Sequence, residues 1–110
     1  MTYKQFVVIV VPFPFTDTAS SKRRPAVVIS ANGFNKNSKH VVCAMITSAK
    51  NSSWESDIPM TDLDSAGLTN ESMIRCKFFT LDQKLINRTI GSLGKKDKAL
   101  FSKTIKNILL

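Results

Sequence analysis

The chain has 110 residues, of which 43% are hydrophobic and 22% charged, so residues 1–110 can form a single domain that buries its core without disulfides or metal ions. Sixteen Lys and Arg residues against eight Asp and Glu residues give a net charge of +8, which favours a polyanion or an acidic protein as partner. No apolar run is long enough to span a membrane and no signal-peptide cleavage site is evident, so we expect a cytoplasmic protein.

The first predicted element is a strand over Phe6–Val11, buried on both faces because the run FVVIVV shows no polar alternation. Pro12–Phe15 predicts a stiff loop outside the sheet, because prolines cannot donate ladder hydrogen bonds. Its two aromatic residues, Phe13 and Phe15, either stack on the bases of a single-stranded nucleic acid or pack in a core or dimer contact. The sequence leaves both interpretations open.

A run of three cations, Lys22–Arg24, precedes Pro25 and a predicted strand over Ala26–Ser30. Pro25 fixes its own φ and favours an extended Arg24, so we expect Arg24 at the mouth of a rigid strand and the other two cations on the loop before it. The arginine fork matches the geometry of phosphate, which makes this run a candidate phosphate anchor. A solvated basic turn is the alternative.

The rest of the chain alternates loops with strands and ends in a helix. The expected elements are a loop over Ala31–Lys39, a strand over His40–Thr47, a loop over Ala49–Ser53, a weak edge strand over Trp54–Pro59, a helical turn over Asp62–Gly67, strands over Ser72–Leu81 and Ile86–Leu93, and a helix after Gly94. One side of that helix carries Leu100, Phe101, Ile105, Ile108 and Leu109. The pattern predicts a mainly β fold with α, a small antiparallel barrel covered by an amphipathic C-terminal helix.

The two cysteines, Cys43 and Cys76, lie far apart in strand-like runs, and only His40 accompanies them. These residues do not form a metal-ligand set of recognisable spacing, so we expect buried free thiols, no metal site and no cofactor.

Four short motifs follow one another along nearly the whole chain: VPFPFTD at Val11–Asp17, RPAVVIS at Arg24–Ser30, ITS at Ile46–Ser48 and FTLD at Phe79–Asp82. Together they resemble the MazF/PemK family, the toxins of bacterial type II toxin–antitoxin systems. The resemblance implies an SH3-like barrel with a C-terminal helix, of the MazF/CcdB kind, in a homodimer. It implies a metal-independent, sequence-selective endoribonuclease that cleaves single-stranded RNA (mRNA) by attack of a 2′-hydroxyl on the adjacent phosphate. It also implies an antitoxin whose acidic, partly disordered segment covers the site.

Carried over by position, the resemblance implies that Arg24 is the catalytic arginine before proline and Thr47 the catalytic threonine, with Ser48 beside it. The chemistry of these residue types agrees. A guanidinium stabilises the charge that builds on phosphate oxygens, and a hydroxyl can hydrogen-bond a phosphate oxygen or the attacking group. Lys22 and Arg23 would then hold neighbouring phosphates.

Two positions depart from the family's pattern. In the PemK branch an R-C-D motif supplies an arginine and an aspartate as acid and base; here Arg75 and Cys76 match, but Lys77 replaces the aspartate. By the period-two rule, Arg75 and Lys77 share one face of their strand, and Arg75 is the second candidate catalytic cation. The family's usual Gly-Asp before the first strand is replaced by Phe6-Val7. No general base is evident, since the one histidine lies at the loop end of a strand.

Two alternatives remain open at this point. One is a toxin of related fold that binds a protein target such as DNA gyrase without chemistry. The other is a catalytically degenerate module, motivated by the two departures, that binds nucleic acid or an antitoxin without cleaving RNA.

Overall fold

The computed structural model describes residues 3–13, 22–50 and 54–110. Six strands form one antiparallel sheet with the spatial order β4-β5-β3-β2-β1-β6. The strands are β1 (Val7–Phe13), β2 (Lys22–Val28), β3 (His40–Ser48), β4 (Ile58–Pro59), β5 (Ser72–Asp82) and β6 (Arg88–Ser92). The helices are α1 (Asn32–Ser38), α2 (Leu63–Ala66), α3 (Lys95–Leu109) and the 3₁₀ turn η1 (Gln83–Leu85).

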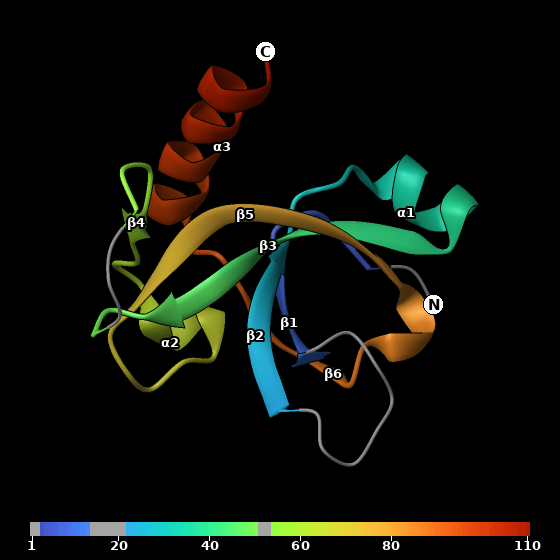
Figure 1. Ribbon diagram of the computed structural model, residues 1–110, viewed down its shortest axis with the longest axis horizontal. Helices are drawn as coiled ribbons and strands as arrows, with labels where there is room; N and C mark the ends of the chain where they lie inside the picture. The colour runs from blue at the N-terminus through green and yellow to red at the C-terminus, as the bar shows by residue number, and fades with distance from the viewer. Residues whose placement is uncertain (1–2, 14–21, 51–53) are drawn as a thin grey trace.

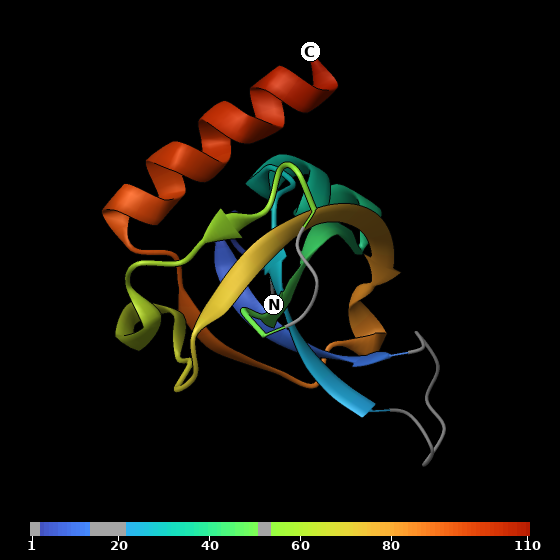
Figure 2. The same cartoon turned by 60° about the vertical axis from the view of Figure 1, so that its left-hand side comes forward.

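The sheet curls into a half-barrel, and α3 lies along one side of it (Figure 1). Figure 2 shows β1 and β2 continuing beyond the other strands as a two-stranded ribbon that points away from α3. The architecture confirms the predicted mainly β fold of the small antiparallel barrel type with a C-terminal helix. Within the described ranges, no helix has both the length and the apolar character required to cross a bilayer.

The central strands are buried on both faces, as predicted for the first strand. Alternate side chains enter two separate apolar clusters, because successive residues of a strand point to opposite sides of the sheet. The α3-side cluster consists of Val8, Val27, Ala44, Ile46, Ile58, Met60, Ala66, Ile74, Leu93 and Phe101. The second cluster, on the other face, consists of Ile9, Val11, Ala26, Val28, Val41, Cys43 and Leu81.

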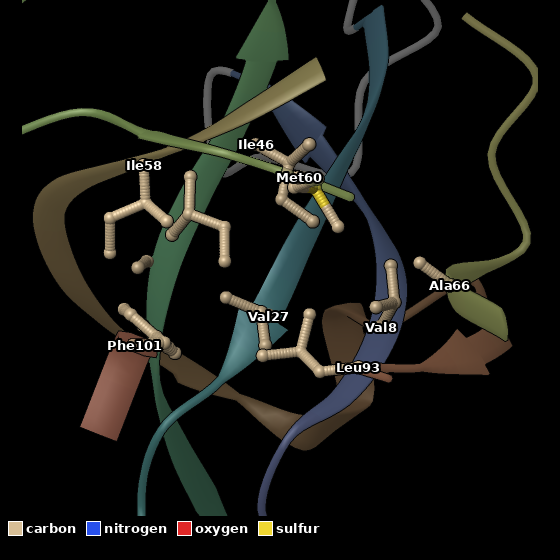
Figure 3. Close-up of a cluster of buried hydrophobic side chains, with 10 residues drawn as sticks. Val8, Val27, Ile46, Ile58, Met60, Ala66, Leu93 and Phe101 are labelled. Atoms are coloured by element: carbon tan, nitrogen blue, oxygen red, sulfur yellow. The ribbon is translucent and has the colours of Figure 1, made fainter. Parts of the chain in front are cut away.

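Helix α3 is joined to the sheet through Phe101, which points into the α3-side cluster (Figure 3). Phe101 is fully buried, and burial of such a side chain contributes about 3 kcal/mol. One turn earlier, Asp97 accepts hydrogen bonds from the backbone N–H groups of Thr61 and Asp62, both at 3.0 Å, and from the Thr61 hydroxyl at 2.7 Å. Phe101 therefore fixes the helix to the α3-side cluster, and Asp97 fixes its start to the segment between β4 and α2.

The far part of α3 differs from the prediction. Phe101 is buried and Ile105 packs partly against the cluster, but Leu100, Ile108 and Leu109 are about half exposed. Ile108 and Leu109 are exposed because a helix of 15 residues spans about 22 Å and only its first turns pass over the sheet. Leu100 lies in those first turns, but it is rotated by about 100° around the helix from the buried Phe101.

The β1–β2 ribbon also corrects the prediction of loops around the prolines. β1 continues through Pro12 to Phe13, and β2 already begins at Lys22, so the first two cations lie on a strand rather than on a loop. Pro12 pairs with Arg23, and Pro25 pairs with Val10. At each proline the strand pairs on one side only. β1 pairs with β6 no further than Val10, which precedes Pro12, and β2 pairs with β3 only from Ala26 onward, which follows Pro25. Prolines are tolerated at such edge positions because no second ladder is interrupted.

The predicted loop over Ala31–Lys39 is wrong, because this segment forms α1. Its sequence has poor helix propensity, but tertiary hydrogen bonds override that preference. The buried Asn35 side chain donates to the backbone oxygens of Tyr3, at 2.8 Å, and Ser30, at 3.1 Å. Lys39 then ends the helix in the left-handed conformation, with a φ of 61°.

The remaining elements agree more closely with the sequence. β3 and β5 cover the predicted strands with an extra residue at one end of each, and β6 lies inside Ile86–Leu93. α2 is the predicted helical turn, closed by Gly67 at a φ of 75°. The edge strand expected over Trp54–Pro59 shrinks to the two residues of β4.

Candidate active site

Strand alternation brings the predicted catalytic residues to one face of the sheet. Phe13, Arg24 and Thr47 are each an even number of residues from members of the second cluster on their own strands. They therefore lie on the same side as that cluster, opposite the face that Phe101 covers.

A pocket of about 280 Å³ opens on this face, lined by Phe13, Arg24, Met45, Thr47, Arg75, Lys77, Phe78 and Phe79. The lining combines three cations with three aromatic rings and a methionine, and it contains no carboxylate among the described residues. In such a pocket the cations suit a phosphate group, and the aromatic rings suit a flat ring that stacks on them. A nucleotide carries both groups.

Arg24 projects into this pocket from the extended backbone ahead of Pro25. Its guanidinium carbon lies 5.6 Å from the centroid of the Phe13 ring, within the range of a cation–π contact. Its Nε atom is buried and has no hydrogen-bond partner in the part of the chain that the structure describes. A buried donor without a partner costs about 1–3 kcal/mol, so this atom favours the binding of an acceptor such as a phosphate oxygen.

Thr47 and Ser48 lie at the end of β3, where a second pocket of about 250 Å³ adjoins the first. The two pockets share Arg24 and Thr47. The second pocket is lined by Arg23, Arg24, Pro25, Ile46, Thr47, Ser48, Leu68, Thr69, Asn70, Glu71 and Ser72. Arg24 and Thr47 thus line both pockets, at the place where the two adjoin.

A β-bulge in β5 shapes the opposite wall of the first pocket. Phe78 lies across from Ala44 and Arg75 across from Met45, so Cys76 and Lys77 have no counterpart on β3. Bulges re-aim side chains and are common beside active sites. Here the bulge accompanies a lining that includes Arg75, Lys77 and two consecutive phenylalanines. Arg75 and Lys77 face one pocket, as the period-two rule predicted.

Arg75 forms an ion pair with the carboxylate of Asp57. Its Nη2 donates to Oδ2 of Asp57 at 2.9 Å, and its Nε donates to Oδ1 at 3.2 Å. The guanidinium carbon also lies 5.1 Å from the centroid of the Trp54 ring. The Asp57 side chain is only 4% exposed, and its hydrogen bond from Arg75 holds its pKa below the ordinary value of 3.8 despite the opposing effect of burial. Asp57 and Trp54 therefore fix the direction in which Arg75 enters the pocket.

The other predicted site residues take different places. Arg23 and Ser48 line the second pocket, and Lys22 is exposed at the start of β2, where it pairs with Phe13. Phe15 lies outside the described residues. His40, the only histidine, is at the opposite end of β3 from Thr47, roughly 20 Å away at strand spacing, and its Nδ1 is 2.9 Å from the oxygen of Ser38.

Sequence reasoning missed several of the lining residues. Lys77 was noted as a departure from a motif, yet it lines the pocket beside Arg24. Met45 and Phe79 follow from strand alternation alone, since each is two residues from a member of the second cluster. Asp57 carried no signal in the sequence, because its position behind Arg75 depends on how the chain before β4 folds back.

The cysteines lie outside this lining. Cys43 is buried as predicted, and burial raises the pKa of its thiol to about 12. Cys76 is only partly buried, which corrects the prediction, and burial raises its pKa against the opposing hydrogen bond with Ser56.

Comparisons with known proteins show which folds and which family this chain is similar to. No curated protein sequence matches the chain. The Mycobacterium tuberculosis toxin MazF-mt6 is 19% identical, with 92% of this chain and 93% of that chain covered at a TM-score of 0.73. MazF of Deinococcus radiodurans is 13% identical over 99% and 97% of the two chains, at a TM-score of 0.75. A mycobacterial endoribonuclease, solved in complex with its cognate antitoxin, is 13% identical over 98% and 93%, at a TM-score of 0.74.

These structures share the fold of this chain. The family itself is shown by the sequence, since residues 4–109 match the pattern described as "PemK-like, MazF-like toxin of type II toxin-antitoxin system". The chain therefore belongs to the MazF/PemK family of type II toxins.

Proposed function

We propose that the protein is a metal-independent endoribonuclease that cleaves single-stranded RNA at a preferred sequence, as the toxin of its toxin–antitoxin pair. Toxins of the MazF/PemK family are endoribonucleases, and one of the similar structures above is described by that activity. The supporting observation in this chain is that Arg24 and Thr47, distant in sequence and on different strands, line the same two pockets.

The proposed reaction is a transesterification within the RNA. The 2′-oxygen attacks the adjacent phosphorus, the bond from phosphorus to the 5′-oxygen breaks, and a 2′,3′-cyclic phosphate and a 5′-hydroxyl result. Arg24 donates from its buried Nε to a non-bridging oxygen, and Arg75 adds a second positive charge. Thr47 hydrogen-bonds the phosphate or the attacking hydroxyl. Preorganised donors of this kind are usually the largest contribution to such catalysis.

The aromatic part of the pocket supplies binding. Phe13, Phe78 and Phe79 present rings on which an unpaired base stacks, and stacking on aromatic side chains contributes about 1–3 kcal/mol per base. Unpaired bases are also what a sequence-selective RNA enzyme can read, because their edges are open.

The test is to incubate the protein with a long RNA in EDTA and to sequence the new ends. We expect cuts at a preferred motif with cyclic-phosphate termini. Arg24→Ala should fold normally and lose on the order of 100-fold in rate, because one preorganised donor is lost. Arg88→Ala removes an exposed arginine of β6 and should cleave at the wild-type rate. RNA that binds tightly and stays intact would instead identify the non-catalytic binding module.

We also propose a homodimer and an acidic antitoxin segment that competes with RNA for the same groove. The net charge of +8 and the three cations of the pocket favour such a segment. The exposed apolar end of α3, with Ile108, Leu109 and the following Leu110, is a surface of the kind that an interface covers. Sedimentation should show a particle of two chains, and an acidic peptide should inhibit cleavage less as the salt concentration rises.

A further inference from the structure

The second pocket, of about 250 Å³, differs in chemistry from the aromatic pocket that it adjoins. Its lining includes Arg23 and Arg24 from β2, but also Asn70 and Glu71 from the segment just before β5. A carboxylate is unexpected on a surface that holds phosphates, because like charges repel one another. The presence of Glu71 in this lining therefore requires an explanation other than phosphate binding.

The backbone fixes Glu71 beside the end of β3. The N–H of Ala49 donates to the oxygen of Glu71 at 3.1 Å, which continues the pairing of β3 with β5. Thr47 lies opposite Met73, and Glu71 is two residues from Met73, so strand alternation places Glu71 on the same face as Thr47. Glu71 thus lies on the face where the proposed reaction takes place.

The carboxylate of Glu71 is available to a ligand. Its side chain is exposed, and within the described ranges no cation forms an ion pair with it. An ionised carboxylate offers two acceptor oxygens side by side and no donor. Such a group is best matched by two neighbouring N–H groups.

Among the bases of RNA, only guanine presents two neighbouring N–H groups on its Watson–Crick edge, at N1 and at the N2 amino group. Adenine and cytosine each present an amino group beside a ring nitrogen that accepts, and uracil presents one N–H between two carbonyl oxygens. These edges are open in unpaired RNA. A carboxylate therefore accepts two hydrogen bonds from guanine, whereas each of the other bases sets an acceptor against one of its oxygens.

We propose that Glu71 selects a guanine next to the phosphate that is cleaved, an inference that rests on the proposed ribonuclease function. The phosphate lies where Arg24 and Thr47 line both pockets. The base on one side of it stacks in the aromatic pocket, and the base on the other side enters the second pocket. There the Glu71 carboxylate accepts hydrogen bonds from N1–H and N2–H of the guanine.

The test measures base selection at the cleavage site. A random RNA pool is cleaved in EDTA, and the new ends are sequenced. The wild-type protein should favour guanine on one side of the cut by about 10- to 100-fold, the discrimination given by one bidentate contact. Glu71→Ala should lose the preference at that position. Glu71→Gln should move it to adenine or cytosine, because an amide pairs one acceptor with one donor.

A base analogue isolates the contact. Inosine lacks the N2 amino group of guanine, so its use at the selected position should lower kcat/KM of the wild-type protein by about 10-fold. The same replacement should leave kcat/KM of Glu71→Ala unchanged, since the two changes remove one interaction. Glu55→Gln is the matched control, the same substitution at an exposed glutamate outside both linings. It should keep the wild-type motif and the wild-type response to inosine.

A wild-type motif without guanine beside the cut would overturn the assignment. A guanine preference that persists in Glu71→Ala and Glu71→Gln would overturn it equally. Both results come from an active wild-type protein, so they refute the assignment of Glu71 and leave the proposed function intact. If the wild-type protein leaves every RNA of the pool intact, the proposed function has failed, and the selection of guanine fails with it.

Discussion

The rings of Phe6 and Phe101 meet edge to face, with centroids 6.2 Å apart and planes inclined by 66°. Phe6 makes this contact from a left-handed backbone, with a φ of 71°, immediately before β1. Its N–H donates to the oxygen of Val28 at 2.7 Å, and Lys98 places its Nζ 5.8 Å from the ring centroid. A strained backbone is therefore held in place by the side chain it carries.

This geometry explains the departure at Phe6, where the family resemblance implies glycine. A left-handed conformation costs a residue other than glycine about 1–2 kcal/mol. The ring offsets this cost by packing on Phe101, which anchors α3, since an aromatic pair contributes about 0.5–1.5 kcal/mol beyond its buried area. In this chain the local support of the first strand thus comes from an aromatic contact with the C-terminal helix.

Substitution of Phe6 should reverse the usual order of alanine and glycine. Phe6→Ala loses the ring and keeps the strain, whereas Phe6→Gly loses the ring and relieves the strain. We expect both variants to be less stable than the wild-type protein by about 2–4 kcal/mol, with Phe6→Gly the more stable of the two by about 1 kcal/mol. Urea denaturation measures the free energies of unfolding. The control is Lys103, an ordinary position inside α3. There Lys103→Gly should be less stable than Lys103→Ala by about 1 kcal/mol, because glycine disfavours a helix. The same order at both positions would contradict the strain at Phe6.

Asp97 should make the protein sensitive to acid. Burial alone would raise the pKa of this carboxyl, but hydrogen bonds from Asp62 and Thr61 hold it below the ordinary value of 3.8. The folded state thus binds protons less readily than the unfolded state, so the stabilisation is complete above pH 3.8 and is lost as the pH falls through the folded-state pKa. Asp97→Asn should lower the free energy of unfolding by about 2 kcal/mol at pH 7, with a smaller difference in stronger acid. Glu55→Gln, which neutralises an exposed carboxylate, should have little effect. A difference for Asp97→Asn that does not shrink in acid would refute this account.

Asp57 should act on catalysis only through Arg75. We expect Arg75→Ala to lower the cleavage rate on the order of 100-fold and Asp57→Asn to lower it by about 10-fold, because the guanidinium loses its fixed direction. The double variant should be no slower than Arg75→Ala alone, since the two residues act as one unit. Single-turnover rates on one RNA complete this cycle. Independent, multiplying losses would show that Asp57 has a separate function.

The two thiols should react at different rates. For Cys43, the rise in pKa from 9.0 to about 12 lowers the thiolate fraction about 1,000-fold at neutral pH, and the side chain is fully buried. We expect a disulfide reagent at pH 8 to modify Cys76 slowly in the native protein and Cys43 only after unfolding. Cys76→Ser should remove the slow native phase. Rapid modification of that variant without denaturant would contradict the burial of Cys43.

The sequence predicted best those elements that depend on long apolar runs. β3 and β5 were found almost to the residue, because each carries such a run and pairs with the other along most of its length. α1 was missed because its helical state depends on hydrogen bonds between Asn35 and distant backbone groups. Local propensity cannot report such contacts.

The residues of the candidate site also fall into two groups, those that the sequence indicates and those that only the fold brings into place. Arg24, Thr47 and Arg75 were found from short motifs, and strand alternation gathers them on one face. The place of Lys77 depends on a bulge, and the contact of Asp57 with Arg75 depends on a turn that brings Trp54 over the guanidinium. Neither leaves a periodic pattern in the sequence, so only the folded chain reveals them.

The prolines of the β1–β2 ribbon have a consequence for the behaviour of the protein at high concentration. A two-stranded arm with open outer edges is a template onto which strands of other molecules could add, as in amyloid growth. Pro12 and Pro25 stand on those outer stretches and offer no N–H to an incoming strand. The ribbon can therefore present Phe13 and Arg24 to a long polymer such as RNA. At the same time, its two edges do not readily accept strands from other molecules, so the protein resists assembly into fibrils.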